Sequence, residues 1–172
     1  DYTYCKVKAA DGHTYYMAEA LLDRVLGKLA TEDAPAYEVL EKYTGKELEG
    51  REYEPLFACA GEVAKKQGKR AHFVTADGYV TTSDGTGIVH IAPAFGEDDY
   101  WTCRNNNIPL VNPVDSKGRF TAEITDFYEE DTDKTVIDMN PVIIRFLYAN
   151  GKGVADGTIE HNYPHCWRCK RP

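Results

Sequence analysis

A histidine and three acidic residues lie within one stretch, residues 85–100, whose character changes halfway along. It reads Gly-Thr-Gly-Ile-Val-His-Ile-Ala-Pro-Ala-Phe-Gly-Glu-Asp-Asp-Tyr. Residues 88–92 are apolar apart from His90 and predict a strand, which a proline ends. Gly96 followed by three acidic residues is typical of a helix start, so we expect a helix over 97–105. Strand, corner and helix N-terminus would bring an imidazole, carboxylates and free backbone N–H groups to one rim.

The two side chains best suited to chemistry there are Asp99 and His90. Asp99 would lie near the third position of the helix, where the dipole and free N–H groups favour an ionised carboxylate. Such a carboxylate at a pocket rim suits an ammonium group, and the alternative is that it only stabilises the helix start together with Glu97 and Asp98. A lone histidine on an apolar strand face is more often a core residue than a catalyst. The nearness of His90 to Asp99 is what favours a functional role.

The glycines that introduce the stretch form a second, weaker signal. Gly85-Thr86-Gly87 could bring backbone close to a ligand, because glycine has no side chain to interfere. It lacks the third glycine of a dinucleotide-binding motif and the lysine of a P-loop. A tight turn is the default interpretation.

The chain has five cysteines, an odd number, and three of them are scattered in apolar contexts. A disulfide framework is therefore not expected, and a reduced, cytoplasmic protein fits better. Cys166 and Cys169 form a Cys-x-x-Cys pair, which is half of a tetrahedral zinc site. His161 and His165 are near, or the missing ligands lie outside this chain. No histidine begins the His-x-Glu of zinc deaminases, and no Gly-x-Ser-x-Gly nucleophile elbow is present.

The net charge of −8 argues against a broad basic face for nucleic acid. Any such contact must be local, and the alternative for each basic cluster is solvated surface. The candidates are Lys65, Lys66, Lys69 and Arg70, and the tail residues Arg168, Lys170 and Arg171. No apolar run is long enough to span a membrane, and no signal-peptide pattern is present.

The remaining segments must position these residues. Asp11-Gly12 between β-prone runs predicts a hairpin of residues 2–10 and 13–18. Leucine spacing predicts a helix over 19–30, and Asn140 followed by Pro141 predicts a helix start with Asn as N-cap, ended by Asn150-Gly151. Further strands are expected at 37–43, 72–75, 79–82, 110–114 and 158–163, with a turn at 115–118, an irregular segment at 45–57, and a loop or disordered insertion at 59–68. The pattern favours a β-rich α+β fold, a barrel with helices set around it.

Residues 85–100 closely resemble the signature of the editing domain inserted into isoleucyl-tRNA synthetases. Residues 163–172, Tyr-Pro-His-Cys-Trp-Arg-Cys-Lys-Arg-Pro, resemble the point where that insertion returns to the synthetase body. Residues 45–50 and 112–114 also fit, so the resemblance spans nearly the whole chain. Valine and leucine enzymes typically carry Lys or Met at the position of His90, which therefore indicates isoleucine.

The resemblance implies hydrolysis of valine wrongly attached to isoleucine tRNA. A hydrophobic pocket gains only about 1–3 kcal/mol from the extra methylene of isoleucine, a range for which this enzyme family is itself the established example. A second, smaller pocket supplies the missing discrimination. By resemblance, Asp99 holds the α-ammonium of valine, and His90 shapes the pocket and positions the ester. The candidate substrate-binding residues are Gly85, Thr86, Gly87, Ala92 and Phe95. Backbone, threonines and the terminal tRNA hydroxyls would position the water, without a dedicated base.

The resemblance also implies an organisation and partners. Residues 1–160 would be the editing domain, and 161–172 the start of the return to the synthetase body. The threonine-rich peptide that lines the family's catalytic floor, and the partners of Cys166 and Cys169 in a zinc knuckle, are expected before residue 1. Editing itself would need no cofactor, whereas the parent enzyme would hold a structural zinc and perform ATP-dependent aminoacylation. The partners would be the acceptor end of tRNA(Ile) and the rest of the synthetase, in a monomer. The alternative is a non-catalytic module that docks tRNA or supports the structure through a zinc knuckle.

Overall fold

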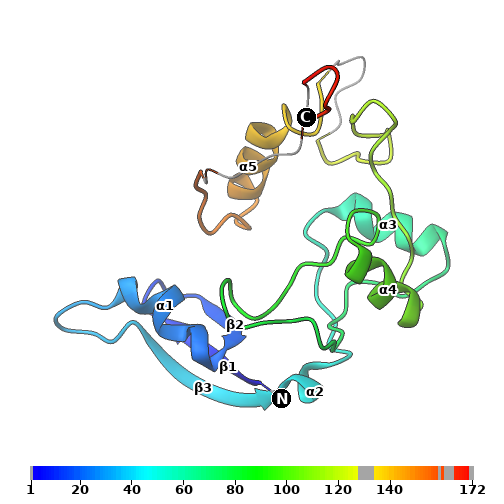
Figure 1. The fold of residues 1–172 in the computed structure, drawn as a ribbon. Coiled ribbons are helices and arrows are strands. Elements are labelled where there is room, and N and C mark those ends of the chain that lie inside the picture. The colour runs from blue at the N-terminus through cyan, green and yellow to red at the C-terminus, as the bar shows by residue number, and fades with distance from the viewer. Residues whose placement is uncertain (1, 128–133, 159, 161–164, 171–172) are drawn as a thin grey trace. The chain divides into compact units, whose positions relative to one another are not determined.

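The computed structural model describes residues 2–127, 134–158, 160 and 165–170. It divides into two compact units, Asp1–Pro113 and Val114–Pro172, each considered by itself below. The elements of the first unit are β1 (Thr3–Ala9), β2 (Thr14–Ala18), η1 (Glu19–Leu21), α1 (Leu22–Leu26), η2 (Gly27–Leu29), β3 (Tyr37–Thr44), α2 (Gly45–Leu48), α3 (Ala58–Lys66) and α4 (Glu97–Asn105). The second unit contains α5 (Asn140–Ala149) (Figure 1). The α+β class predicted from the sequence is confirmed.

The sheet of the first unit has three antiparallel strands in the order β2-β1-β3. The predicted hairpin joins β1 to β2, and Gly12 supplies the positive φ (+89°) that its tight turn requires. The predicted strand at 37–43 is β3, which pairs with the other edge of β1 and has a register shift at Lys6/Val7. In the described part of the chain this sheet is open, so the expected barrel is not confirmed.

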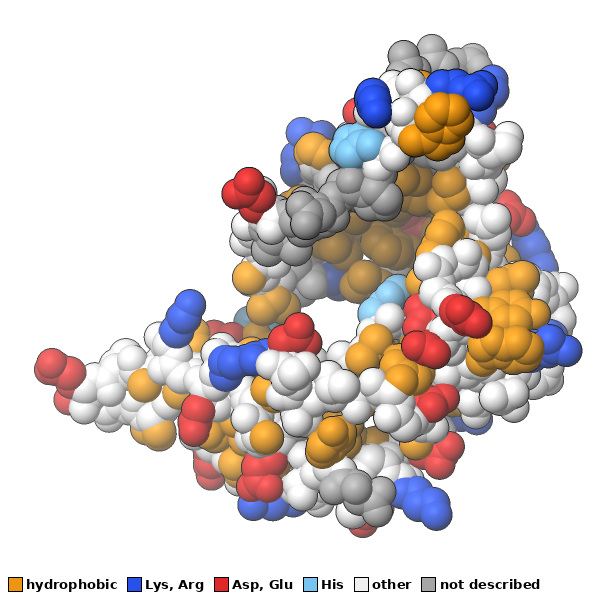
Figure 2. Space-filling view, in the orientation of Figure 1, with side chains coloured by type: hydrophobic (Ala, Val, Ile, Leu, Met, Phe, Trp, Pro, Cys, Tyr) orange, Lys and Arg blue, Asp and Glu red, His pale blue; other side chains and the backbone are white. Residues whose placement is uncertain are grey.

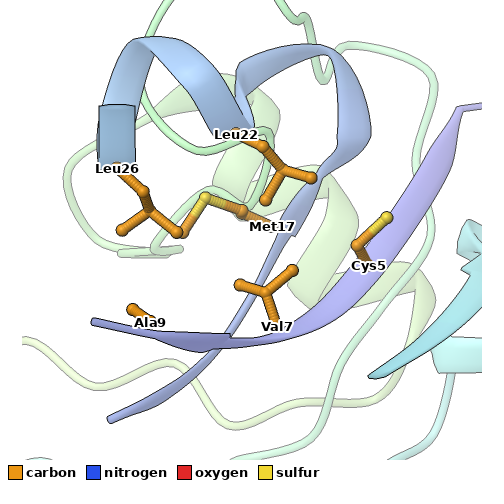
Figure 3. Packing of buried hydrophobic residues seen from close by; sticks show 6 residues of the cluster. All are labelled: Cys5, Val7, Ala9, Met17, Leu22 and Leu26. Carbon is orange, nitrogen blue, oxygen red and sulfur yellow. The ribbon is translucent and has the colours of Figure 1, made fainter. Parts of the chain in front are cut away.

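The main core lies between one face of this sheet and the helical segment that follows β2. The predicted helix over 19–30 is present as three short helical pieces, η1, α1 and η2, with Gly27 at the start of the last piece. Figure 3 shows Leu22 and Leu26 of α1 pointing onto side chains of the two strands below. Buried together there are Cys5, Val7, Ala9, Met17, Leu22 and Leu26.

Two expectations for residues 45–68 need correction. Residues 45–48 are not irregular but form α2, whose start is fixed by a capping box between Thr44 and Glu47. Residues 59–68 are not a loop for most of their length, because α3 covers Ala58–Lys66. Cys59, Val63 and Ala64 are buried at helical spacing, so a narrow stripe of small residues is enough to hold this helix.

The expected strands at 72–75, 79–82, 88–92 and 110–114 are wrong. In the described residues, these segments contribute only isolated bridges, Glu52 with Phe73 and Val114 with Phe120. An apolar, β-branched segment becomes a strand only where another backbone lies alongside to receive its hydrogen bonds. Residues 72–74 exchange three backbone hydrogen bonds with residues 50–53, which is too short a pairing to form a strand. The expected strand at 158–163 lies largely outside the described residues.

In the second unit the predicted turn at 115–118 and the helix α5 are confirmed. Gly118 N donates to Asp115 O at 3.0 Å, and α5 ends at Ala149, with Asn150 as its C-cap and Gly151 at φ +67°. The N-cap, however, is Met139 and not Asn140, because the Met139 carbonyl accepts the first backbone hydrogen bonds of the helix. No helix among the described residues is long and apolar enough to cross a membrane.

Candidate functional site

The candidate site is built on a corner between the glycine turn at 85–87 and α4. Phe95 N donates to Ala92 O at 2.9 Å, which closes a β-turn with Pro93 at its second position, where the fixed φ of proline fits. Gly96 follows as the N-cap residue of α4, in an extended conformation. The predicted helix over 97–105 has the expected bounds, and its first turn carries Glu97, Asp98 and Asp99.

Asp99 folds back onto this corner. Its Oδ2 accepts a hydrogen bond from Ala92 N at 3.0 Å, and its Oδ1 accepts one from the Tyr79 hydroxyl at 3.3 Å. Gly96 leaves the room that this requires, because a Cβ there would lie 2.8 Å from Asp99 Oδ2. The carboxylate is half-buried and α4 has no side-chain cap hydrogen bond. The Asp99 carboxylate therefore links α4 to the turn before it by a hydrogen bond. It lies at a helix end whose dipole favours negative charge.

Tyr79 and its neighbours are participants that the sequence did not reveal. Burial, and next the charge of Asp99, raise the pKa of Tyr79, against a smaller opposing contribution from a hydrogen bond with Thr102. The phenol is therefore protonated and a donor at neutral pH. Thr102, only 2% exposed, donates from its hydroxyl to Asp77 Oδ2 at 2.7 Å. Segment 77–79 is thus tied to two residues of α4, three positions apart on one helix face.

The glycine turn at 85–87 packs against the sheet and hydrogen-bonds to it. Thr86 O accepts a hydrogen bond from Ala18 N at 2.8 Å, and Gly87 O accepts one from the buried Tyr4 hydroxyl at 3.0 Å. Gly87 has φ +75°, and a Cβ there would lie 2.5 Å from Ala18 Cβ. The close approach expected of these glycines is present, but at Gly87 the neighbour is β2 rather than a ligand.

His90 and Phe95 lie on the exposed side of this stretch. His90 is exposed, so the alternative of a buried core histidine is wrong. Phe95 is 62% exposed although it is a large apolar side chain. Tyr100 and Trp101 of α4 are also exposed, with their rings in an edge-to-face contact at 5.3 Å. Figure 2 shows hydrophobic side chains gathered on the surface near α4. The segment around Asp99 thus carries apolar side chains that are accessible from solvent.

The cysteine pair belongs to the second unit. Cys166 and Cys169 are exposed free thiols within one turn, in which Lys170 N donates to Cys166 O at 2.9 Å. Hydrogen bonds from the backbone N–H groups of Cys169 and then of Arg168 lower the pKa of the Cys166 thiol. This favours the thiolate form that binds zinc. Among the described residues, no group of three or more His, Cys, Asp or Glu side chains could hold a metal ion.

Comparison with known proteins places these features in a family. No family model matches the chain. The isoleucine–tRNA ligase of Fervidobacterium pennivorans is 42% identical over 173 residues, which covers 100% of this chain and 17% of the ligase. The ligases of Bdellovibrio bacteriovorus and Nocardia farcinica are each also 42% identical over 173 residues, covering 100% of this chain and 15% of the ligase. The chain thus spans about one-sixth of the length of these relatives. It belongs to the isoleucine–tRNA ligase family, as the homologue of one segment of those enzymes.

Proposed function

We propose that this chain is the editing module of an isoleucine–tRNA ligase and hydrolyses valine that has been wrongly joined to tRNA(Ile). The observation that carries the proposal is the half-buried carboxylate of Asp99, fixed at the N-terminus of α4 by Ala92 N and the Tyr79 hydroxyl. A fixed, negatively charged group on the same short segment as an accessible imidazole suits the ammonium group of an aminoacyl ester.

The assigned chemistry is ester hydrolysis. A carboxylate has about four lone-pair positions, and the two hydrogen bonds to Asp99 leave others for the α-ammonium of valine. The exposed imidazole of His90 would contact the ester and limit the space for the amino-acid side chain. Water adds to the ester carbonyl, the bond to the tRNA oxygen breaks, and valine and the free 3′-terminal hydroxyl are released. Gly85, Thr86, Ala92 and Phe95 would line the approach to the ester, whereas Gly87 would support this turn from β2.

Replacement of Asp99 in the full-length ligase tests this proposal. We expect D99A to lower kcat/KM for hydrolysis of Val-tRNA(Ile) by about 10- to 100-fold, because a hydrogen bond to a charged group is worth roughly 1.5–3 kcal/mol. D98A removes the same charge from the adjacent, exposed position of the same helix turn and is expected to change kcat/KM by less than about twofold. Equal activity of the two variants would contradict the proposal.

His90 is proposed to set the preference for valine. In the same assay, H90A would remove side-chain volume from the pocket and admit the longer side chain of isoleucine. Its expected signature is increased hydrolysis of correctly charged Ile-tRNA(Ile) relative to Val-tRNA(Ile). A variant that slowed both reactions equally, with their ratio unchanged, would assign His90 to another role.

For the second unit we propose a structural zinc site in the whole protein. Cys166 and Cys169 would supply two thiolates, and the donors to the Cys166 sulfur fit that role. A structural zinc takes four ligands, so the other two would come from the rest of the ligase chain. The test is zinc content per full-length chain: C166S should lower it, whereas C59S, at a buried cysteine of α3, should not.

The alternative function, a non-catalytic tRNA-docking module, is favoured by one observation, the 77% exposed Trp167 beneath the Arg168 guanidinium. It predicts that R168A weakens tRNA binding while D99A leaves deacylation intact.

The remaining expectations about the parent protein are proposals of the same kind. We assign ATP-dependent aminoacylation to other parts of the ligase chain, expect the ligase to be a monomer in the cytoplasm, and expect the open sheet to be part of a larger, barrel-like editing domain. Sedimentation of the full-length ligase tests whether it is a monomer.

A further inference from the structure

We infer that Tyr79 is a positioning residue for the Asp99 carboxylate, and that segment 77–79 acts as a clamp that fixes where an aminoacyl ammonium group can bind. This inference rests on the proposed function of Asp99 and adds a residue to it. Tyr79 itself would touch neither the ester nor the water, and would act only through Asp99.

The first step of the argument is the set of contacts around Asp99. Its two oxygens face two different neighbours, Ala92 N at 3.0 Å and the Tyr79 hydroxyl at 3.3 Å, and a Cβ on Gly96 would lie only 3.0 Å from the carboxylate carbon. The Ala92 contact holds the carboxylate against the turn, and the Tyr79 contact fixes the rotation of the carboxylate about its own bond. Loss of the phenol hydroxyl would leave the second oxygen free to turn, so that the direction in which the negative charge points would no longer be set.

The second step is that Tyr79 is itself held in place. Thr102, one turn after Asp99 in α4, donates to Asp77 Oδ2 at 2.7 Å and is almost fully buried. The other oxygen of Asp77 accepts from Gly78 N at 2.6 Å, so both carboxylate oxygens of Asp77 have partners. Both ends of the clamp therefore meet the same helix. Because a buried hydroxyl without a partner is costly, the Thr102–Asp77 hydrogen bond resists opening.

The third step concerns the protonation of Tyr79. A positioning donor must keep its proton under working conditions. The environment raises the pKa of Tyr79 above its ordinary value near 10, so the phenol donates throughout the neutral range. The contact is thus a constant feature of the site and not a switch.

The experiment is steady-state hydrolysis of Val-tRNA(Ile) by the full-length ligase, with kcat and KM determined separately. Y79F removes only the hydroxyl and keeps the ring, and Y16F is its matched control, at an exposed tyrosine of β2. We expect Y79F to lower kcat/KM by about 3- to 10-fold, mainly through KM, because the misdirected carboxylate binds the ammonium group less well. Y16F should stay within about twofold of the parent enzyme.

A double-mutant cycle separates positioning from general stability. If Tyr79 acts through Asp99, Y79F should cause no further loss in a D99A background. A loss of equal size with and without Asp99, or no loss from Y79F at all, would overturn the inference while leaving the proposed function standing. Unchanged hydrolysis in D99A would overturn both. D77N, which weakens the other end of the clamp without touching the phenol, should reproduce the KM effect in smaller measure, and its failure to do so counts against the clamp.

Discussion

The contact between Gly87 and Ala18 gives the sharpest stability prediction. In G87A the new Cβ would lie 2.5 Å from Ala18 Cβ, on a residue held at φ +75°. The left-handed conformation costs a non-glycine residue about 1–2 kcal/mol, and overpacking a close contact costs about 1–3 kcal/mol more. We therefore expect G87A to destabilise the docking of the 85–87 turn on β2 by roughly 2–5 kcal/mol.

Gly85 provides a matched control within the same turn. It has φ +65°, but a Cβ there would meet nothing within 4 Å. G85A should therefore carry only the backbone cost of about 1–2 kcal/mol. The difference between the two variants isolates the steric contact with Ala18, at about 1–3 kcal/mol.

Amide hydrogen exchange of residue 18 is the direct assay, because Ala18 N donates to Thr86 O and is protected only while the turn is docked. Exchange in G87A should be about 5- to 150-fold faster than in G85A. Adding A18G to G87A removes the clashing methyl group and should restore part of the protection. Equal exchange in G85A and G87A would refute the reasoning, because it would mean that β2 yields to the new methyl group at no cost.

Three further predictions concern the core, an acidic turn and the cysteine pair. In denaturant titrations, L22A should lower the free energy of unfolding by about 2–5 kcal/mol, because Leu22 is only 3% exposed. V25A, at a 37% exposed position of the same helix, should change it by less than about 0.5 kcal/mol. A hydrogen bond from the backbone N–H of Arg119, assisted by the Arg119 guanidinium, lowers the pKa of Asp115 in the folded protein. The stabilisation of this turn is therefore present above the unfolded pKa of Asp115 and lost as pH falls through its folded pKa. NMR across acidic pH should detect this loss of stability in the parent protein, and D115N should remove the pH dependence. Cys166 should be alkylated with a midpoint below the usual thiol pKa, as measured by mass spectrometry across pH.

The elements that the sequence predicted well are those specified within a few residues. The hairpin at Asp11-Gly12 depends on a single turn whose glycine has a positive φ, and α4 depends on a glycine followed by acidic residues at its first turn. The end of α5 depends on Gly151 in the left-handed region. In each case the determining chemistry is local, so no knowledge of distant contacts was needed.

The elements that the sequence did not predict depend on partners far along the chain. Residues 88–92 have a strand composition, but Ala92 N bonds to the Asp99 side chain and Ile88 N to the Thr86 hydroxyl, so side chains take the place of a neighbouring strand. The Tyr79–Asp99 contact joins residues 20 positions apart and leaves no periodic signal. In α3 the buried stripe consists of small residues in a lysine-rich segment, which resembles a loop by composition.

Asp99 shows why the two interpretations of its carboxylate, helix stabiliser or ammonium anchor, cannot be separated by alanine replacement alone. D99A removes both the ties to the corner and the charge. D99N keeps both hydrogen bonds. Its amide oxygen can accept from Ala92 N, and its amide nitrogen can donate to the Tyr79 hydroxyl oxygen, because a hydroxyl can both donate and accept. We therefore expect D99N to retain the protection of the Ala92 amide against hydrogen exchange while losing hydrolysis of Val-tRNA(Ile) nearly as fully as D99A. That combination would assign the loss to the missing charge, whereas D99N with full hydrolytic activity would show that Asp99 serves only to hold the corner together.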